Sequence, residues 1–294
     1  MSRCLVTGGA GFVGSHLVDS LVFLGHEVFI IDDESSVSRK TFHWNSKAKK
    51  IYADLRDYSK VIALFKNENP EYVFHLAANS HIQQAVRNPR LVLENNILGT
   101  INIFDCSRLY KVKRVLFASS ASVCESEGSS NAYSLSKIFG EKLVKLYYEQ
   151  YGLESVGLRC FNIYGERQVT DGEYIPIIGA LLNAKKTGKD LEIYGDGTQE
   201  RDFVYVGDVV KSNILAMFSH DCRVLGEIIE VGTGKSHSII EIARRAGVNI
   251  KFSAPKEGEI KVSRADTNKI IELLNFLPEN SIEKWLNDQQ PGKE

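Results

Sequence analysis

The chain lacks several features that point to common functional classes. Its 36 basic and 37 acidic residues leave a formal net charge of −1, so no basic surface for nucleic acid or an anionic membrane is expected. Its five cysteines form no CxxC pair, which argues against a zinc site and favours reduced thiols in a cytoplasmic protein. Neither a secretory leader nor an apolar run of membrane-spanning length is present. We therefore expect no nucleic-acid, membrane or metal partner.

Apolar runs of strand length alternate with segments of helical periodicity in the first half of the chain. The expected strands cover residues 4–7, 28–31, 51–53, 72–76, 114–118 and 155–160, and the expected helices cover 15–24, 58–67, 89–110 and 132–151. This alternation is typical of βαβ units. It predicts the α/β class, with a Rossmann-type doubly wound parallel sheet and a smaller C-terminal α/β region.

The first motif with chemical meaning is TGGAGFVGSH, between the first strand and the first helix. Gly8, Gly11 and Gly14 let backbone amides of this turn, including those of Phe12 and Val13, approach a pyrophosphate at the positive end of the helix dipole. Glycines also serve ordinary strand-to-helix turns, so the motif needs its context.

The context is an acidic pair at the end of the second strand. Asp32 follows Gly14 at about the spacing at which a carboxylate accepts both ribose hydroxyls of a dinucleotide, and Asp33 comes next. An acid there repels a 2′-phosphate, so NAD is favoured over NADP; Arg39 and Lys40 are the only basic residues that could weaken this preference. We expect an NAD-binding domain over residues 1–165, to which the chain returns around 203–232, and a mainly substrate-binding region over 166–294.

The segment YSLSK begins the expected helix over residues 132–151. Tyr133 and Lys137 are one helical turn apart and share a face, where an ammonium group and an oxidised nicotinamide favour the phenolate. Lowering a tyrosine pKa from about 10 to about 7 requires roughly 4 kcal/mol of preferential stabilisation of the anion. Most such pairs are surface residues of amphipathic helices. Here a serine cluster at the end of a strand precedes the pair, which favours catalysis.

The chain resembles the extended short-chain dehydrogenase/reductases, specifically the nucleotide-sugar epimerase/dehydratase family, and within it the UDP-glucose and UDP-N-acetylglucosamine 4-epimerases. The resemblance runs in order through TGGAGFVGSH, Asp54-Leu55, HLAA, NNILGT, SSAS, YSLSK, LRCFNIYGERQ and GDGTQERDFVYVGDVV. It implies that Tyr133 is the catalytic base, that Ser120 binds the sugar oxygen and that Lys137 holds the nicotinamide ribose. It also implies cofactor contacts from Asp54, Leu55, Leu76, Ala77, Ala78, Asn96 and Ser119, with Ser119 satisfying backbone groups at the strand end.

The residues after the active-site strand distinguish the subfamilies. Dehydratases and decarboxylases of this superfamily usually carry a carboxylate where this chain has Ser120, Ala121 and Ser122, because an acid must assist the later steps. Its absence favours epimerisation at C4, while a dehydratase, a reductase, an epimerase at another carbon and a non-catalytic NAD-binding protein stay open. Cys124 is interpreted as a packing residue rather than a catalytic thiol. The connector that follows it is shorter than in relatives.

The resemblance places the nucleotide sugar against the second half of the chain. An Arg can bind phosphate oxygens bidentately, and an ion pair with a neighbouring acid is the alternative for Arg201. Ser263 matches a position where a bulky Tyr excludes N-acetylated sugars in some hexose epimerases, which favours UDP-GlcNAc/UDP-GalNAc, alone or with UDP-Glc/UDP-Gal. The substrate contacts implied are Ser120, Ser122, Tyr133, Asn162, Leu191, Tyr194, Arg201, Lys256, Glu259 and Ser263.

The same resemblance implies a homodimer built from two helices of each subunit. Here these are the helices expected over residues 89–110 and 132–151, and the second carries Leu135, Phe139 and Leu146 on its outer face. The apolar outer face permits such a contact.

Overall fold

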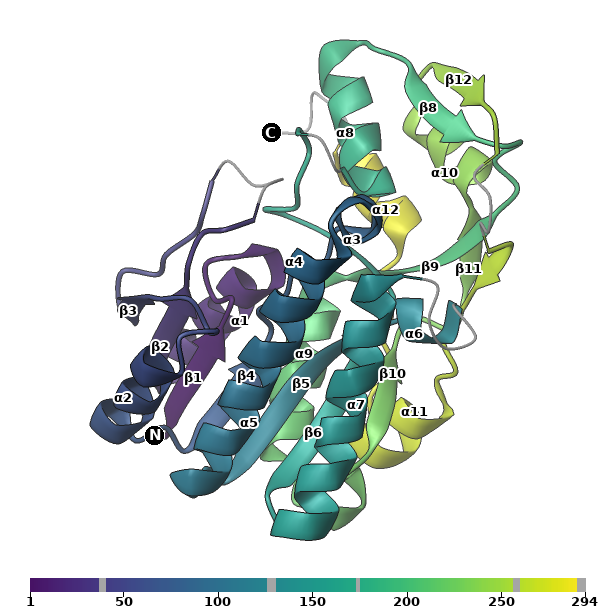
Figure 1. Ribbon diagram of the computed structural model, residues 1–294. Coiled ribbons are helices and arrows are strands. Elements are labelled where there is room, and N and C mark those ends of the chain that lie inside the picture. The colour runs from purple at the N-terminus through teal and green to yellow at the C-terminus, as the bar shows by residue number, and fades with distance from the viewer. Residues whose placement is uncertain (37–40, 126–130, 173–174, 256–259, 290–294) are drawn as a thin grey trace. The chain divides into compact units, whose positions relative to one another are not determined.

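The computed structural model describes residues 1–36, 41–125, 131–172, 175–255 and 260–289. The backbone forms two compact units (Figure 1). The first contains Met1–Ser36, Lys40–Arg159 and Val210–Ile229, and the second contains Cys160–Val209 and Glu230–Glu294. The assignment of the cofactor to one part of the chain and the substrate to the other stays a prediction.

The first unit is built on a seven-stranded sheet with the order β10-β6-β5-β4-β1-β2-β3. Its strands are β1 (Arg3–Thr7), β2 (Glu27–Asp32), β3 (Lys49–Tyr52), β4 (Tyr72–His75), β5 (Arg114–Ser120), β6 (Glu154–Cys160) and β10 (Ile228–Val231). The pairings of β1 with β2 and β4, of β2 with β3 and of β4 with β5 are parallel. The order reverses at β1, as in doubly wound nucleotide-binding folds, so the predicted Rossmann-type sheet is confirmed.

The helices of this unit cover both faces of the sheet. They are α1 (Phe12–Phe23), α2 (Tyr58–Glu68), α3 (Ile82–Arg87), α4 (Pro89–Leu93), the π-helix η1 (Glu94–Leu98), α5 (Gly99–Leu109), α6 (Ser122–Glu125), α7 (Ala132–Tyr151), α9 (Val206–Phe218) and the 3-10 helix η2 (Cys222–Val224). In Figure 1, α5 and α7 run side by side in front of the sheet. Alternate strand residues such as Leu5, Phe29 and Phe117 pack against α2, α5 and α7 in one buried cluster.

The helix expected over residues 89–110 is interrupted. The π-helix η1 inserts one wide turn between α4 and α5, and Asn96 lies at its centre. Such bulges concentrate at functional sites, because an extra residue in the turn redirects a side chain. The short helix α3 also has no counterpart among the expected elements, since its six residues are too few for a periodic signal.

The second unit has its own small core. β9 (Glu200–Tyr205) lies between β11 (Ser236–Ser238) and β13 (Val262–Ser263) and also pairs with β7 (Asn162–Tyr164), while β8 (Leu191–Tyr194) pairs with β12 (Ile250–Ser253). The helices are α8 (Ile177–Thr187), α10 (Ile239–Ala246), α11 (Asn268–Leu274) and α12 (Ile282–Asp288). Residues of α8, α10 and α12 pack with Tyr164, Leu191 and Phe203 in one cluster.

Within the described part of the chain, no helix has the length and apolar character needed to cross a membrane. The five cysteines all belong to the described residues, and no disulfide joins them.

Candidate active site

The glycine motif forms a tight turn between β1 and α1, and the spacing of its glycines has a steric cause. Gly8 has φ +68°, and a Cβ there would lie 2.9 Å from the backbone of Ala77. A Cβ at Gly14 would lie 2.1 Å from the Gly8 carbonyl oxygen. Gly11 caps α1 and offers no side chain to the helix, so the first-turn N–H groups, which include those of Phe12 and Val13, face a ligand position. The turn is a cradle that larger residues would fill.

Asp32 ends β2 beside this turn. Its carboxylate accepts hydrogen bonds from the amides of Ala10 at 3.1 Å and Glu34 at 2.9 Å. Burial raises the pKa of Asp32 above its ordinary value, and the two amide donors only partly offset that effect. Asp33 turns to the following loop, where it accepts bonds from the amide and hydroxyl of Ser35. Asp32 is therefore the carboxylate held at the turn.

The segments predicted to reach the adenine and to line the cofactor follow β3 and β4. Asp54 is held by Arg56 at 2.6 Å, which lowers the pKa of its carboxyl group, and the Leu55 carbonyl accepts a bond from Asn102 at 2.8 Å. Leu76 and Ala77 bond through their amides to Thr7, and Ala78 follows. Because β1 to β4 are parallel neighbours, these segments share one edge of the sheet with the glycine turn.

The serine cluster ends β5, and each serine has a different environment. Ser119 donates to the carboxylate of Glu141 rather than to backbone groups, so the expectation for its side chain is wrong. The carboxylate is preferred because Glu141, one turn beyond Lys137 on α7, points back at the strand end. Ser120 is half-buried and its hydroxyl accepts the amide of Ser122 at 3.2 Å. Ser122 is buried where α6 begins.

The start of α7 brings Tyr133 and Lys137 to the same strand end. Asn131 caps the helix by accepting the Ser134 amide, which fixes its first residue. The Lys137 ammonium group donates to the Ala118 carbonyl at 2.6 Å and lies 5.8 Å from the centre of the Tyr133 ring. Both side chains are buried, with exposed fractions of 9% for Tyr133 and 4% for Lys137. The fold therefore brings the Tyr133–Lys137 pair to the end of β5, the strand that ends in Ser120.

A partly buried ion pair beside this constellation had no counterpart in the sequence interpretation. Arg159 of β6 binds both carboxylate oxygens of Glu141, at 3.0 and 2.8 Å, and donates to the sulfur of Cys124 at 3.0 Å. The position of Glu141, four residues after Lys137, was the available signal. Cys124 is exposed rather than packed in a core, so its interpretation as a packing residue is wrong. Its small α6 helix leaves the thiol at the surface.

Besides Ser120, Ser122 and Tyr133 of the first unit, the described residues predicted to bind substrate lie in the second unit. Asn162 donates to the Asp202 carbonyl at 3.0 Å, and Arg201 donates to the carbonyls of Glu200 and Ile260, each at 2.8 Å. Leu191 is buried in the core cluster, whereas Tyr194 is partly exposed. Ser263 pairs with Arg201 in the β9–β13 ladder. Lys256 and Glu259 lie outside the described residues, as do Arg39 and Lys40 and most of the short connector.

The profile of the NAD dependent epimerase/dehydratase family matches residues 4–232. The chain belongs to this family. A putative UDP-glucose 4-epimerase of Methanocaldococcus jannaschii is 36% identical over 300 residues, covering 96% of this chain and 95% of that protein. The UDP-N-acetylglucosamine 4-epimerase of Methanobrevibacter ruminantium, solved with UDP-N-acetylmuramic acid, is 31% identical with a TM-score of 0.88, over 98% of this chain and 96% of that one. The UDP-glucose 4-epimerase of Thermus thermophilus, solved with NAD, is 30% identical with a TM-score of 0.85, over 97% and 96%.

Membership in the epimerase/dehydratase family makes the chain an enzyme that uses NAD. The turn fits this cofactor, because its glycines leave a cradle, its helix N-terminus suits a pyrophosphate and Asp32 supplies an acceptor for ribose hydroxyls. A nucleotide with a 2′-phosphate would meet the charge of Asp32.

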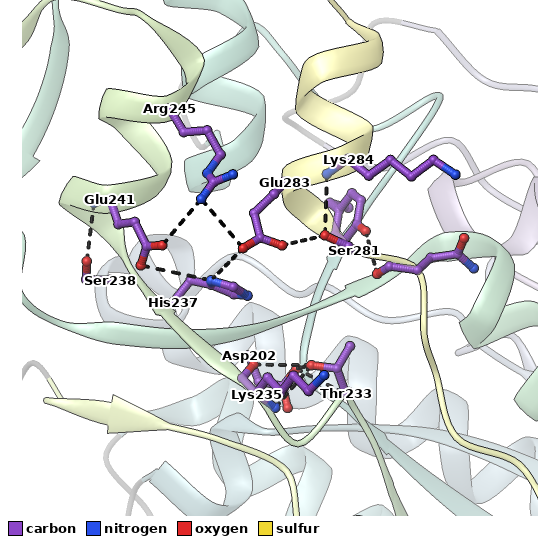
Figure 2. A network of polar contacts seen from close by, with 12 residues as sticks. Asp202, Thr233, Lys235, His237, Ser238, Glu241, Arg245, Ser281, Glu283 and Lys284 are labelled. Carbon is purple, nitrogen blue, oxygen red and sulfur yellow. Dashed lines mark hydrogen bonds and ion pairs between the residues drawn. The ribbon is translucent and has the colours of Figure 1, made fainter.

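A second polar cluster lies in the other unit of this family member (Figure 2). His237 of β11 lies 4.0 Å from Glu241 of α10 and 3.7 Å from Glu283 of α12. Ligand atoms of these three residues all lie within 4.8 Å of one another, a spacing that a metal ion could bridge. Arg245, however, lies 3.9 Å from each of the two carboxylates and already supplies positive charge. We interpret the cluster as an ion-pair network that ties three elements together.

Proposed function

We propose that this enzyme catalyses the NAD-dependent 4-epimerisation of a UDP-sugar through a transient 4-keto sugar. The substrate pair is UDP-GlcNAc/UDP-GalNAc, UDP-Glc/UDP-Gal, or both. One observation carries the choice of reaction. β5 ends beside the Tyr133–Lys137 pair, and the chain there reads Ser120-Ala121-Ser122, which lacks the carboxylate that elimination of water requires.

The neighbouring carboxylate does not replace the missing acid. Glu141 accepts hydrogen bonds from two Arg159 nitrogens, Nε and Nη2, and from the Ser119 hydroxyl, and its side chain is 11% exposed. Both carboxylate oxygens are occupied by these donors, so the side chain is held in the ion pair rather than offered to a substrate oxygen. The site therefore favours proton transfer through Tyr133 alone.

Each residue of the constellation has a role in this reaction. As phenolate, Tyr133 takes the proton from the C4 hydroxyl and returns it after the keto sugar has turned over. Ser120 donates a hydrogen bond to the same oxygen, and the Lys137 ammonium group stabilises the phenolate and binds the nicotinamide ribose. Bound at the glycine turn, NAD would supply the hydride acceptor for oxidation at C4 and the hydride donor for reduction of the keto sugar on its other face. Because the cofactor is regenerated in every turnover, tight retention suits the reaction.

The second unit supplies the proposed substrate contacts. Arg201 and Asn162 bind the diphosphate, Leu191 and Tyr194 border the base, and Ser122 of the first unit contacts the sugar. Ser263 is 3% exposed, and a serine there excludes less volume than the tyrosine of hexose-specific relatives. Lys256 and Glu259 complete the set.

The reaction is tested by incubating the purified protein separately with UDP-GlcNAc and UDP-Glc and following the sugar ring protons by NMR. Formation of the C4 epimer, with its smaller coupling constants, is the expected result. Formation of a 4-keto-6-deoxy sugar would instead show a dehydratase, and release of CO2 in a further incubation with UDP-glucuronate would show a decarboxylase. No C4 epimer from either substrate would refute the proposal.

Tyr133→Phe separates chemistry from binding. It removes the phenolic oxygen but keeps the ring, so we expect loss of turnover with NAD still bound. Activity retained within a few-fold of wild type would contradict the role of Tyr133.

We also propose a cytoplasmic homodimer. Leu135 and Leu146 of α7 are 42% and 44% exposed, while Phe139 packs partly against the core of its own unit. Sedimentation velocity of the wild type and of a Leu135→Glu/Leu146→Glu variant tests the contact, because two charges on this face would separate the subunits. A monomeric wild type would overturn it.

A further inference from the structure

A histidine outside the proposed chemistry lies between the glycine turn and the catalytic helix. His75 ends β4 and is buried, with 1% of its surface exposed. Its Nδ1 lies 2.7 Å from the hydroxyl of Thr7 at the end of β1, and its Nε2 lies 2.9 Å from the hydroxyl of Thr100 in α5. The imidazole therefore bridges two segments that are 93 residues apart in the chain (100 − 7).

The hydrogen bonds around His75 determine which nitrogen carries its proton. The Thr100 hydroxyl donates its one proton to the Asn96 carbonyl at 2.5 Å, so it can only accept from Nε2. Nε2 therefore bears the proton, and in the neutral ring Nδ1 is an acceptor. The Thr7 hydroxyl consequently donates to Nδ1 while it accepts the amide of Ala77 at 3.1 Å. With this tautomer, each hydrogen bond around His75 pairs one donor with one acceptor.

The chain of hydrogen bonds continues from Asn96 to the catalytic helix. The Asn96 side chain in the π-helix accepts the Asn79 amide at 2.7 Å and donates to the Ser136 hydroxyl at 2.9 Å. Ser136 in turn donates to the Tyr133 carbonyl at 2.7 Å. The wide turn of η1 thus aims one amide side chain at both the loop after β4 and the first turn of α7.

The other end of the chain of hydrogen bonds reaches the cofactor turn. Thr7 directly precedes Gly8, and Ala77, whose amide Thr7 accepts, is the residue that a Cβ on Gly8 would strike. A displacement of Thr7 therefore moves Ala77, against whose backbone the glycine turn packs.

We propose that neutral His75, as its Nε2–H tautomer, is a positioning residue that sets the spacing between the dinucleotide turn and the helix carrying Tyr133. The imidazole suits this position because it has a donor and an acceptor on opposite sides of a rigid ring. The catalytic part of this inference rests on the proposed role of Tyr133, whereas the link to the NAD turn does not.

The surroundings of His75 keep its ring neutral. Burial, together with the positive charge of Lys137, lowers the pKa of His75 to about 3. The Phe117 ring covers it at 5.9 Å between centroids. Protonation would place a donor at Nδ1 and break the direction of the hydrogen bonds at Thr7.

The tautomer can be observed in the wild-type NAD-bound enzyme by 15N NMR of histidine-labelled protein, assigned by loss of the His75 signal in His75→Gln. We expect one imidazole with a protonated Nε2 and an unprotonated Nδ1, unchanged between about pH 5 and 8. An Nδ1–H tautomer, or a ring that titrates in this range, would overturn the inference without any reference to the sugar substrate.

The positioning role is tested by kinetics on His75→Phe, which removes both bonds, and His75→Gln, whose amide reproduces the Nε2 donor. We expect His75→Phe to lower kcat about ten- to a hundredfold with little change in KM, and to release NAD faster; His75→Gln should recover part of kcat. Leu64→Ala, a core truncation in α2, is the control for lost stability. The role would be overturned if Leu64→Ala, at the same melting temperature as His75→Phe, lost as much kcat. It would also be overturned if His75→Gln recovered no kcat relative to His75→Phe.

The outcomes also separate this inference from the proposed function. If the NMR and NAD-release results hold but no C4 epimer forms, only the reaction assignment fails. If the epimer forms but His75→Phe keeps wild-type kcat and NAD retention, only the positioning role fails.

Discussion

Gly140→Ala should show how closely α7, the helix that carries Tyr133 and Lys137, must approach the sheet. Gly140 lies two turns after Tyr133 on α7, where the helix crosses Phe117 of β5. A Cβ on Gly140 would lie 2.1 Å from Cζ of Phe117 and 2.6 Å from both Cε atoms. Since ordinary carbon contacts begin near about 3.5 Å, the helix or the ring must shift by roughly 1.4 Å.

The expected cost follows from two opposing effects. In a helix interior Ala is favoured over Gly by about 1 kcal/mol. Overpacking a buried site costs typically about 1–3 kcal/mol, and Phe117, 1% exposed, has no open space to enter. We therefore expect a net loss of up to about 2 kcal/mol in the free energy of unfolding. The same shift moves Tyr133 and Lys137 against Ser120, and a displacement of about 1 Å can lower kcat about a hundredfold.

The assay is urea unfolding combined with steady-state kinetics on whichever UDP-sugar is turned over. Phe117→Leu and the double variant Gly140→Ala/Phe117→Leu complete a double-mutant cycle, because the smaller side chain makes room for the new methyl group. We expect the double variant to recover kcat relative to Gly140→Ala. A Gly140→Ala enzyme with wild-type stability and kcat would refute the argument that this glycine determines how closely α7 packs against β5.

Three further predictions concern other parts of the chain. The carboxylate of Asp202 is fully buried and accepts hydrogen bonds from the amides of Thr233, Gly234 and Ala265. Asp202→Asn would turn an amide nitrogen toward these donors and should lower the free energy of unfolding by about 3 kcal/mol. An unchanged midpoint of urea unfolding would contradict this. Ser263→Tyr should lower kcat/KM for UDP-GlcNAc at least tenfold more than for UDP-Glc, and an equal loss for both would remove Ser263 as a selector. Burial raises the pKa of Asp32 above 3.8, so on acidification its carboxylate should become protonated, and NAD binding should weaken, before the pH has fallen to that value. Titration calorimetry would show this onset, whereas Asp32→Asn should bind NAD weakly at every pH and show no onset.

Much of the first unit was predictable because its signals are local. Strand-length apolar runs and helical periodicity located the helix Ala132–Tyr151 and six of the seven strands of the sheet, all but β10, to within one or two residues. The requirement for Gly14 also lies within the motif, because a Cβ there would be 2.1 Å from the Gly8 carbonyl oxygen, whereas Gly8 is required by contact with the distant Ala77. Tyr133 and Lys137 share a face through helix geometry alone.

Other features depended on contacts between distant segments. The π-helix arises where Asn96 meets Asn79 and Ser136, and no periodicity in residues 94–98 announces it. The prediction that Ser119 bonds to backbone groups is wrong because nothing in the strand indicates that Glu141 reaches it. The prediction that Cys124 is packed follows from the usual burial of cysteine, whereas its short helix leaves it exposed.

The sequence by itself determined the fold class, the family, the cofactor and the candidate residues at the end of β5, because each depends on short motifs whose geometry is set by neighbouring residues. Only the tertiary structure decided which polar groups satisfy one another inside the sheet and helices. The pairing of Arg159 with Glu141, and the direction of the hydrogen bonds through His75, follow from side chains that meet only after strands and helices far apart in the chain have packed. Burial removes water as a partner, so each of these groups must find its bond in the protein.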